Sequence, residues 1–278
     1  MASNAPMRFA LNHMAAPQLR VRDFFALARR LELYEVEIRN DIEGEAILDG
    51  TPASAIRGMA NEAGVVILTI NALQRFNDWT TERAREAAEL IGYARDCGAR
   101  ALILVPTNDG RHGSDAERAK NLRTALAALL PMLKDNGVAG LVEPLGFASC
   151  SLRSKREAAE AISDVGGAGA LRITHDTFHH HLAGEPELFA QLTGLVHISG
   201  VADRKVGVDG MRDAHRVLVD RSDRLGNIEQ IRALLAAGYS GPFSFEPFAA
   251  ELRTLADPAQ AIGQSIKFIE AELAAKAA

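Results

Sequence analysis

The chain of 278 residues contains only two cysteines, Cys97 and Cys150. Two cysteines are too few for a disulfide framework, and their spacing does not match a zinc finger. Long apolar runs are also missing, because no segment approaches the roughly 18 residues of a membrane-spanning helix and residues 1–6 contain no apolar leader. These absences disfavour a disulfide-stabilised secreted protein and a membrane protein. We therefore expect a cytoplasmic protein in a reducing compartment.

The chain has fewer basic residues than acidic ones. The chain has 31 Lys and Arg against 36 Asp and Glu, a formal charge of −5, and its basic residues are scattered instead of forming a stripe. A nucleic-acid-binding surface needs a basic patch, so nucleic acid is not expected as a partner. Hydrophobic residues make up 47% and charged residues 24%, which is typical of a soluble globular chain and excludes disorder.

The chain lacks the glycine fingerprint that follows the first strand of a dinucleotide-binding fold. Instead, short apolar runs rich in β-branched residues recur roughly every thirty residues, each followed by an amphipathic stretch. Eight such runs predict strands at 8–12, 34–38, 65–70, 101–105, 139–142, 171–174, 195–198 and 243–245. Glycines at 64, 98, 137 and 238 follow helical stretches as helix-ending residues do. We predict an α/β protein in which residues 1–278 form a single (β/α)8 TIM barrel.

Polar residues stand at the carboxyl ends of the predicted strands, where barrel enzymes carry their active sites. They are Asn12, His13, Glu37, Arg39, Asn71, Glu143, Asp176, His197 and Glu246. If these ends converge on one mouth, several carboxylates would repel one another without a cation. The last four strands supply three carboxylates and one imidazole, which suit Mn²⁺ or Mg²⁺ and tolerate Co²⁺ or Zn²⁺. The predicted metal ligands are Glu143, Asp176, His197 and Glu246; a metal-free polar mouth is the alternative.

A histidine run, His179 to His181, follows Asp176 closely. His179 lies three residues after a presumed ligand, where the loop leaving the strand would aim it at the substrate. His180 and His181 are expected to be part of a solvated loop. His13 is expected to form a pocket wall. Glu37 and Arg39 share parity on their strand and are expected to face inward, with a plain internal ion pair as the alternative.

Four segments resemble the xylose-isomerase-like TIM-barrel superfamily and, within it, the inosose isomerases. They are Tyr34–Arg39, Ile70–Asn77, His175–His181 and Phe243–Phe248, and Asp213–Arg216 is also similar. The resemblance implies one divalent ion, Mn²⁺ foremost, on the four predicted ligands, and a substrate contact from His179. The other residues expected to bind substrate are His13, Glu37, Arg39, Asn71 and Arg216.

The implied reaction converts 2-keto-myo-inositol to 1-keto-D-chiro-inositol through an enediol. The ion would stabilise the growing oxyanion, and Glu143 and Glu246 would carry the proton. A ketose 3-epimerase and a hydroxypyruvate-type isomerase would use the same machinery, and a non-catalytic sugar-binding protein is a further alternative. An abasic-site endonuclease is disfavoured by the acidic balance. The expected partner is a small polyol ketone or ketose, and homo-oligomerisation stays open.

Overall fold

The computed structural model describes residues 7–42, 47, 50–111 and 113–275. Eight parallel strands form the central sheet: β1 (Phe9–Asn12), β2 (Glu35–Arg39), β3 (Val66–Gln74), β4 (Ala101–Val105), β5 (Ala139–Val142), β6 (Leu171–Asp176), β7 (Thr193–Ile198) and β10 (Phe243–Phe245). The sheet closes on itself, because β10 pairs with both β7 and β1. The predicted (β/α) barrel is therefore confirmed.

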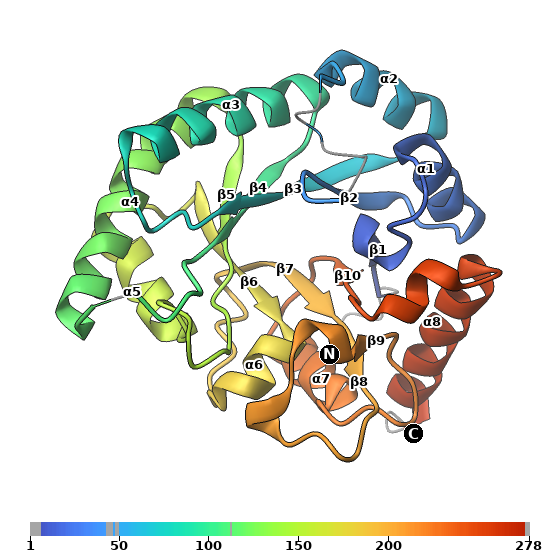
Figure 1. Ribbon diagram of the computed structural model, residues 1–278. Coiled ribbons are helices and arrows are strands. Elements are labelled where there is room, and N and C mark those ends of the chain that lie inside the picture. Colours follow the sequence, from blue (N-terminus) through green and yellow to red (C-terminus); the bar gives the residue numbers. More distant parts are fainter. Residues whose placement is uncertain (1–6, 43–46, 48–49, 112, 276–278) are drawn as a thin grey trace.

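Helices surround the barrel on its outside (Figure 1). They are α1 (Val21–Arg30), α2 (Ala53–Ala63), α3 (Thr81–Cys97), α4 (Asp115–Asn136), α5 (Lys155–Asp164), α6 (Thr177–Ala183), α7 (Asn227–Ala236) and α8 (Pro258–Ala275). Short 3-10 turns lie at η1 (His13–Ala15), η2 (Val208–Gly210), η3 (Asp213–His215) and η4 (Ala250–Thr254), and a small antiparallel pair is formed by β8 (Gly200–Val201) and β9 (Arg216–Val217). No helix in the described parts of the chain combines the length and apolar character needed to cross a membrane.

Each of the eight predicted runs forms a strand, but three strands end later than predicted, β2 by one residue at Arg39 and two others by more. β3 continues to Gln74, because Leu73 still pairs with Leu104 of β4 after a register shift. β6 continues to Asp176, which pairs with His197 of β7. Asn71 and Asp176 therefore belong to strands and do not merely follow them.

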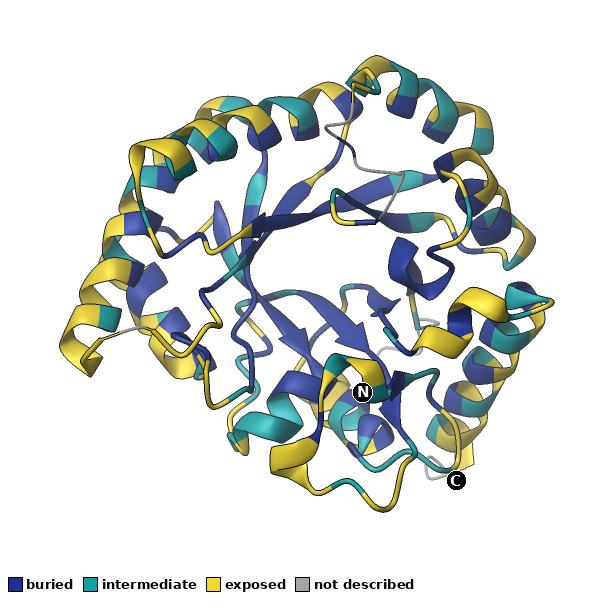
Figure 2. Cartoon of the chain, in the orientation of Figure 1, coloured by how far each residue is buried: buried dark blue, intermediate teal, exposed yellow. Residues whose placement is uncertain are grey.

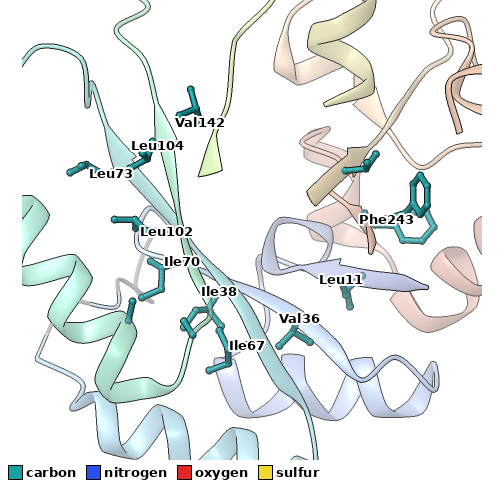
Figure 3. Close-up of a cluster of buried hydrophobic side chains, with 14 of the residues drawn as sticks. Leu11, Val36, Ile38, Ile67, Ile70, Leu73, Leu102, Leu104, Val142 and Phe243 are labelled. Carbon is teal, nitrogen blue, oxygen red and sulfur yellow. The ribbon is translucent and has the colours of Figure 1, made fainter. Parts of the chain in front are cut away.

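Alternation along the strands separates an outer core from the barrel interior. On β7, Val196 and Ile198 pack in the cluster between strands and helices, while Leu195 belongs to a smaller cluster inside the barrel. Figure 3 shows the outer cluster, with Ile67, Ile70 and Leu102 among its members. Burial is densest in the strands, whereas the helices alternate between buried and exposed faces (Figure 2). The inward positions at the carboxyl ends of the strands are left for polar side chains.

Candidate functional site

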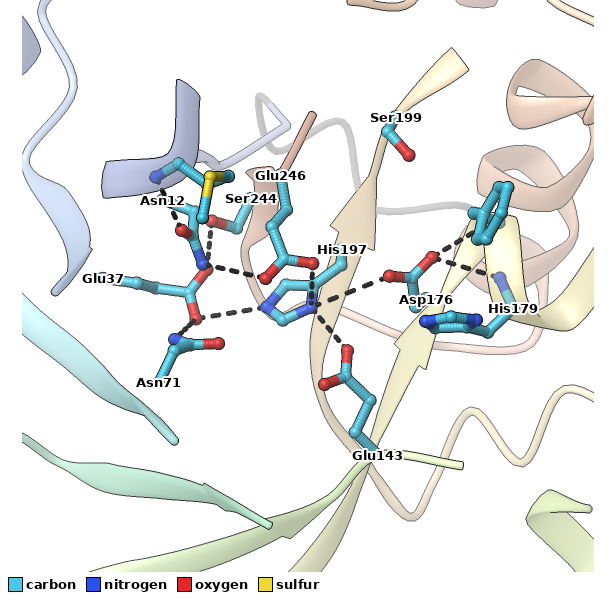
Figure 4. Close-up of polar contacts among 12 residues, drawn as sticks. Asn12, Glu37, Asn71, Glu143, Asp176, His179, His197, Ser199, Ser244 and Glu246 are labelled. Carbon is cyan, nitrogen blue, oxygen red and sulfur yellow. Dashed lines mark hydrogen bonds and ion pairs between the residues drawn. The ribbon is translucent and has the colours of Figure 1, made fainter. Parts of the chain in front are cut away.

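The four predicted metal ligands meet at the carboxyl ends of four neighbouring strands (Figure 4). Glu143 follows β5, Asp176 ends β6, His197 lies in β7 and Glu246 follows β10. All four are buried, and one ligand atom from each lies within 4.8 Å of the others. The closure of the barrel thus gathers residues that are far apart in the sequence at one point.

The distances in this cluster fit a single coordinated cation. His197 Nδ1 lies 2.8 Å from Glu143 Oε1, 3.2 Å from Glu246 Oε2 and 4.0 Å from Asp176 Oδ2. Ligand atoms placed about 2.0–2.4 Å from one ion are separated from each other by about 2.8–4.8 Å. The donor set and the separations therefore suit a divalent ion, with His197 as the only nitrogen ligand of the four.

Asp176 is oriented by the helix that follows it. Its Oδ1 accepts hydrogen bonds from the backbone N–H of Phe178 at 2.7 Å and of His179 at 3.3 Å, as the N-cap of α6. This leaves Oδ2 directed to the cluster. The histidine run therefore lies on a short helix, and the expectation of a loop leaving β6 was wrong, because the Asp176 cap starts a helix at Thr177.

Glu37 contacts His197 on the side of the imidazole ring that faces away from the cluster. The Nε2 of His197 lies 3.1 Å from Glu37 Oε2, and the same oxygen accepts from Thr69 at 2.6 Å and from Asn71 at 3.0 Å. Burial would raise the pKa of Glu37, but His197 and the hydroxyl of Ser244 outweigh it and lower the pKa to about 2. Such a carboxylate–histidine pair fixes the ring and its tautomer. Glu37 and Asn71 do face inward, and both are engaged beneath His197.

Two arginines surround Glu246. Arg39 Nη1 donates to Glu246 Oε1 at 2.7 Å, and Arg216 Nη2 donates to Glu246 Oε2 at 3.0 Å and to Asp176 Oδ2 at 2.7 Å. Both guanidinium groups lie over the ring of Phe248, at 5.3 Å and 4.6 Å from its centroid. Arg39 pairs with Asp41 and Glu246, so the alternative of an internal ion pair with Glu37 is wrong. Asn12, also expected at the mouth, adds a 3.3 Å contact to Glu246.

The charges of the cluster act on His197 and Glu246 in opposite directions. Burial lowers the pKa of His197, but the carboxylates of Glu246, Glu37 and Glu143 outweigh it and raise the pKa well above its usual range. Burial raises the pKa of Glu246, but His197, Arg216 and Arg39 outweigh it and hold the pKa far below its usual range. The carboxylates thus favour positive charge at the centre of the cluster.

His13 follows β1 and His179 follows β6, and the two side chains share one feature. The Nδ1 atom of each is buried and has no hydrogen-bond partner among the described residues. His13 Nε2 lies 2.9 Å from the Leu19 carbonyl, to which it must donate, and its ring stacks on Phe24. The His179 ring packs edge-on against Phe147 and Phe178. Both rings are therefore held in place with one nitrogen unused.

His180 does not belong to a solvated loop, contrary to expectation. Its Nδ1 lies 2.8 Å from Lys155 Nζ, and the same amine lies 3.0 Å from His175 Nδ1. His175 in turn bonds Gln230 at 2.9 Å. This buried network joins α5, β6, α6 and α7 behind Asp176. No sequence spacing indicated it, because its members lie on four separate elements.

The neutral, buried imidazole of His13 predicts a loss of stability in acid. Burial lowers its pKa from 6.5 to about 4. The unfolded chain therefore takes up a proton first as the pH falls, and the stabilisation present above pH 6.5 is lost progressively down to pH 4, by about 3 kcal/mol. Urea unfolding between pH 7 and pH 4 should show a shallower pH dependence in His13→Gln than in wild type. Identical profiles would mean that His13 titrates normally in the folded protein.

Comparison with known proteins agrees with this architecture. The family model described as xylose isomerase-like TIM barrel matches residues 25–272. A solved xylose isomerase domain containing protein from Salmonella typhimurium LT2 is 33% identical, with a TM-score of 0.87, over 95% of this chain and 97% of that one. No curated protein sequence matches the chain closely enough to add to this.

Two more distant solved structures share the fold. The IOLI protein, solved with a zinc atom, is 19% identical with a TM-score of 0.84, over 97% of this chain and 99% of that one. D-Psicose 3-epimerase from Clostridium cellulolyticum H10, solved with D-tagatose, is 13% identical with a TM-score of 0.72, over 96% of this chain and 99% of that one. From the family match over most of its length and the 33% identity to the Salmonella protein, the chain belongs to the xylose isomerase-like TIM barrel family.

Proposed function

We propose that the protein is a divalent-metal-dependent isomerase that converts 2-keto-myo-inositol to 1-keto-D-chiro-inositol through an enediol. The observation that carries this proposal is the buried cluster of Glu143, Asp176, His197 and Glu246 at the barrel mouth. The four residues can hold one ion, and two of them, Glu143 and Glu246, are glutamates from different strands that could also carry a proton. The zinc atom in the similarly folded IOLI protein supports a metal at such a site.

Glu143, Asp176, His197 and Glu246 would hold the ion. Three carboxylates and one imidazole favour Mn²⁺ and also accept Mg²⁺, Co²⁺ or Zn²⁺. When bound, the ion supplies Lewis-acid polarisation of the substrate carbonyl. Glu37 contributes by accepting the proton of His197 Nε2, which leaves the Nδ1 lone pair directed to the cluster. We therefore assign Glu37 a positioning role beneath the site.

The two glutamates differ in their surroundings, which suggests a division of roles. Both oxygens of Glu246 accept hydrogen bonds from arginines, which keep it ionised and able to take the proton from the hydroxyl-bearing carbon next to the carbonyl. Glu143 contacts His197 through Oε1, and its Oε2 accepts no hydrogen bond from the described residues. With Oε1 directed to the cluster, Oε2 is the oxygen that can carry a proton. We assign Glu143 as the acid that returns a proton to the former carbonyl carbon.

The unused nitrogens of His13 and His179 support a polyhydroxylated substrate. Buried polar atoms are nearly always hydrogen-bonded, and we propose that hydroxyl groups of the substrate supply the partners that these two nitrogens lack. Because His13 Nε2 donates to Leu19, its Nδ1 must accept, and a substrate hydroxyl is a suitable donor. Arg39 and Arg216 stay proposed substrate contacts, and Asn71, whose Nδ2 is engaged with Glu37, could contact the substrate only through its Oδ1.

His179→Asn should lower turnover by about 10²-fold while leaving the metal content near that of wild type. The reason is that the ring contacts the substrate and not the ion. His181→Asn is the matched control, since His181 lies on the same helix and is only half-buried. Steady-state kinetics and elemental analysis of both variants test this, and equal losses of turnover would refute a special role for His179.

A ketose 3-epimerase is the second candidate, because D-psicose 3-epimerase and L-ribulose 3-epimerase share the barrel. Hydroxypyruvate-type isomerisation and sugar binding without turnover remain weaker alternatives. Metal-loaded protein should be incubated with 2-keto-myo-inositol, D-psicose, L-ribulose and hydroxypyruvate, and the products analysed by NMR. The proposal expects the highest kcat/KM with 2-keto-myo-inositol. A higher value with D-psicose or L-ribulose would transfer the assignment to the epimerases.

A further inference from the structure

A second cavity lies at the opposite end of the barrel from the candidate metal site. The alternation that directs Asp176 and Glu246 into the mouth also directs Arg172, four residues before Asp176, to the amino-terminal end of the interior. The cavity there has a volume of about 440 Å³, within the range of small-molecule sites. Arg8, Arg100 and Arg172, from the starts of three strands, line it.

A mainly apolar layer lies between this cavity and the metal site, and Thr69, which donates to Glu37 at 2.6 Å, is a polar residue that lines the cavity. Ala10, Ile103, Leu141 and Leu195 pack inside the barrel between the two ends. A molecule bound in the lower cavity would therefore be different from the substrate held at the mouth.

Small residues make room for the arginine side chains. Ala101, Ala139 and Gly194 line the cavity. A Cβ atom on Gly194 would lie 2.7 Å from a methyl group of Leu141 and 3.2 Å from the Cβ of Arg172. The absence of a side chain at Gly194 thus lets Arg172 lie against β7, where its Nη2 donates to the carbonyls of Gln191 at 3.1 Å and Thr193 at 2.9 Å.

The cavity is positively charged although the chain as a whole carries −5. None of the described residues that line it is acidic. Glu35 lies nearby and is shared by two arginines, since it pairs with Arg8 and lies 3.5 Å from Arg100. Arg172 forms no ion pair with any described carboxylate. The three arginines carry three positive charges and Glu35 one negative charge, so the net charge around the cavity is about +2.

We propose that this cavity binds a small oxyanion, the phosphate group of inorganic phosphate or of a phosphorylated metabolite. Guanidinium groups present paired N–H donors that match the oxygens of phosphate, and arginines from separate strands can contact it from several sides. Thr193 and Gln191 also line the cavity; their side chains donate to the carbonyls of Phe189 and Ala237, each at 3.0 Å, so that their oxygens are left to accept from hydroxyl groups of a larger ligand. The two sources of the same group, free phosphate and a phosphomonoester, are distinguished by the test.

Isothermal titration of the full-length, metal-loaded protein, dialysed free of chelator, tests the site with inorganic phosphate and with glucose 6-phosphate. Potassium chloride at matched ionic strength is the control for screening. Both probes are expected to bind saturably at one site per chain, the tighter of them identifying the source of the phosphate. Arg172→Met should weaken binding by about 10-fold or more, because it removes a charge-assisted hydrogen bond.

Two further variants keep the test independent of folding. Arg100→Gln changes a side chain that is 59% exposed at the rim and should weaken binding without affecting the fold. Arg85→Met removes the same charge from the exposed surface of α3, outside the cavity, and should bind as wild type does. Absence of saturable binding in wild type, or equal affinities in the Arg172, Arg100 and Arg85 variants, would overturn the proposal.

Discussion

Removal of the divalent ion is expected to lower isomerase turnover by more than about 10³-fold, because Lewis-acid stabilisation of the developing oxyanion contributes several kcal/mol. Elemental analysis of protein purified without chelators should find about one ion per chain, as one cluster of four ligands implies. Dialysis against a chelator should abolish activity, and added Mn²⁺ should restore it.

The matched control is Asp176→Asn. The asparagine side chain would keep an oxygen that can cap α6 but would lose the charged oxygen directed at the cluster, so metal affinity should fall while the fold is retained. Circular dichroism and metal titration separate these two effects. Full activity in wild-type protein shown by elemental analysis to be free of metal would contradict the role of the ion.

Glu143→Gln and Glu246→Gln are expected to lower turnover by about 10²–10⁴-fold even when saturated with metal. Glutamine keeps a carbonyl oxygen for the ion but can neither accept the substrate proton, as proposed for Glu246, nor return one, as proposed for Glu143. Glu143→Gln is the cleaner variant, since Glu143 contacts only His197 among the described polar side chains. Glu246→Gln also leaves Arg39 and Arg216 without their shared carboxylate, so a larger loss of stability should accompany it.

Turnover of each variant should be measured over a range of Mn²⁺ concentrations, so that weak metal binding is not mistaken for loss of the proton carrier. A hydride shift from the hydroxyl-bearing carbon to the carbonyl carbon would need neither glutamate as a proton carrier. In that case a metal-saturated Glu143→Gln protein would retain substantial turnover, and the proposed proton carriers would be wrong.

The barrel and its ligand cluster could be predicted from the sequence because both depend on local patterns. Eight apolar runs mark the strands, and polar residues at their carboxyl ends mark the mouth. The sequence alone predicted that four ligands lie together, since a closed barrel brings the carboxyl ends of all its strands to one place. These ligands are Glu143, Asp176, His197 and Glu246. The alternation of side chains along β2 also predicted correctly that Glu37 and Arg39 face the barrel interior, where both are buried.

The partners of these residues could not be predicted, because they depend on depth and distance across the barrel. Glu37 was expected at the substrate, but it lies one layer deeper, where His197, Thr69 and Ser244 surround it. Alternation on β10 offered one unused signal, since Ser244 lies two residues before Glu246 and faces the same side. The stacking of Arg39 and Arg216 on Phe248 joins three separate segments and leaves no pattern in the sequence.

Proton transfer on a polyhydroxylated ketone by this barrel is tested most directly by NMR in D₂O. Metal-loaded wild-type protein incubated with 2-keto-myo-inositol should form 1-keto-D-chiro-inositol with deuterium at the former carbonyl carbon. Glu246→Gln should show neither product nor exchange, because it lacks the base, whereas Glu143→Gln should lose product formation. A protein that only binds sugar would leave every ring proton in place. Product that forms rapidly without deuterium, together with undiminished turnover in metal-saturated Glu143→Gln and Glu246→Gln, would contradict the mechanism.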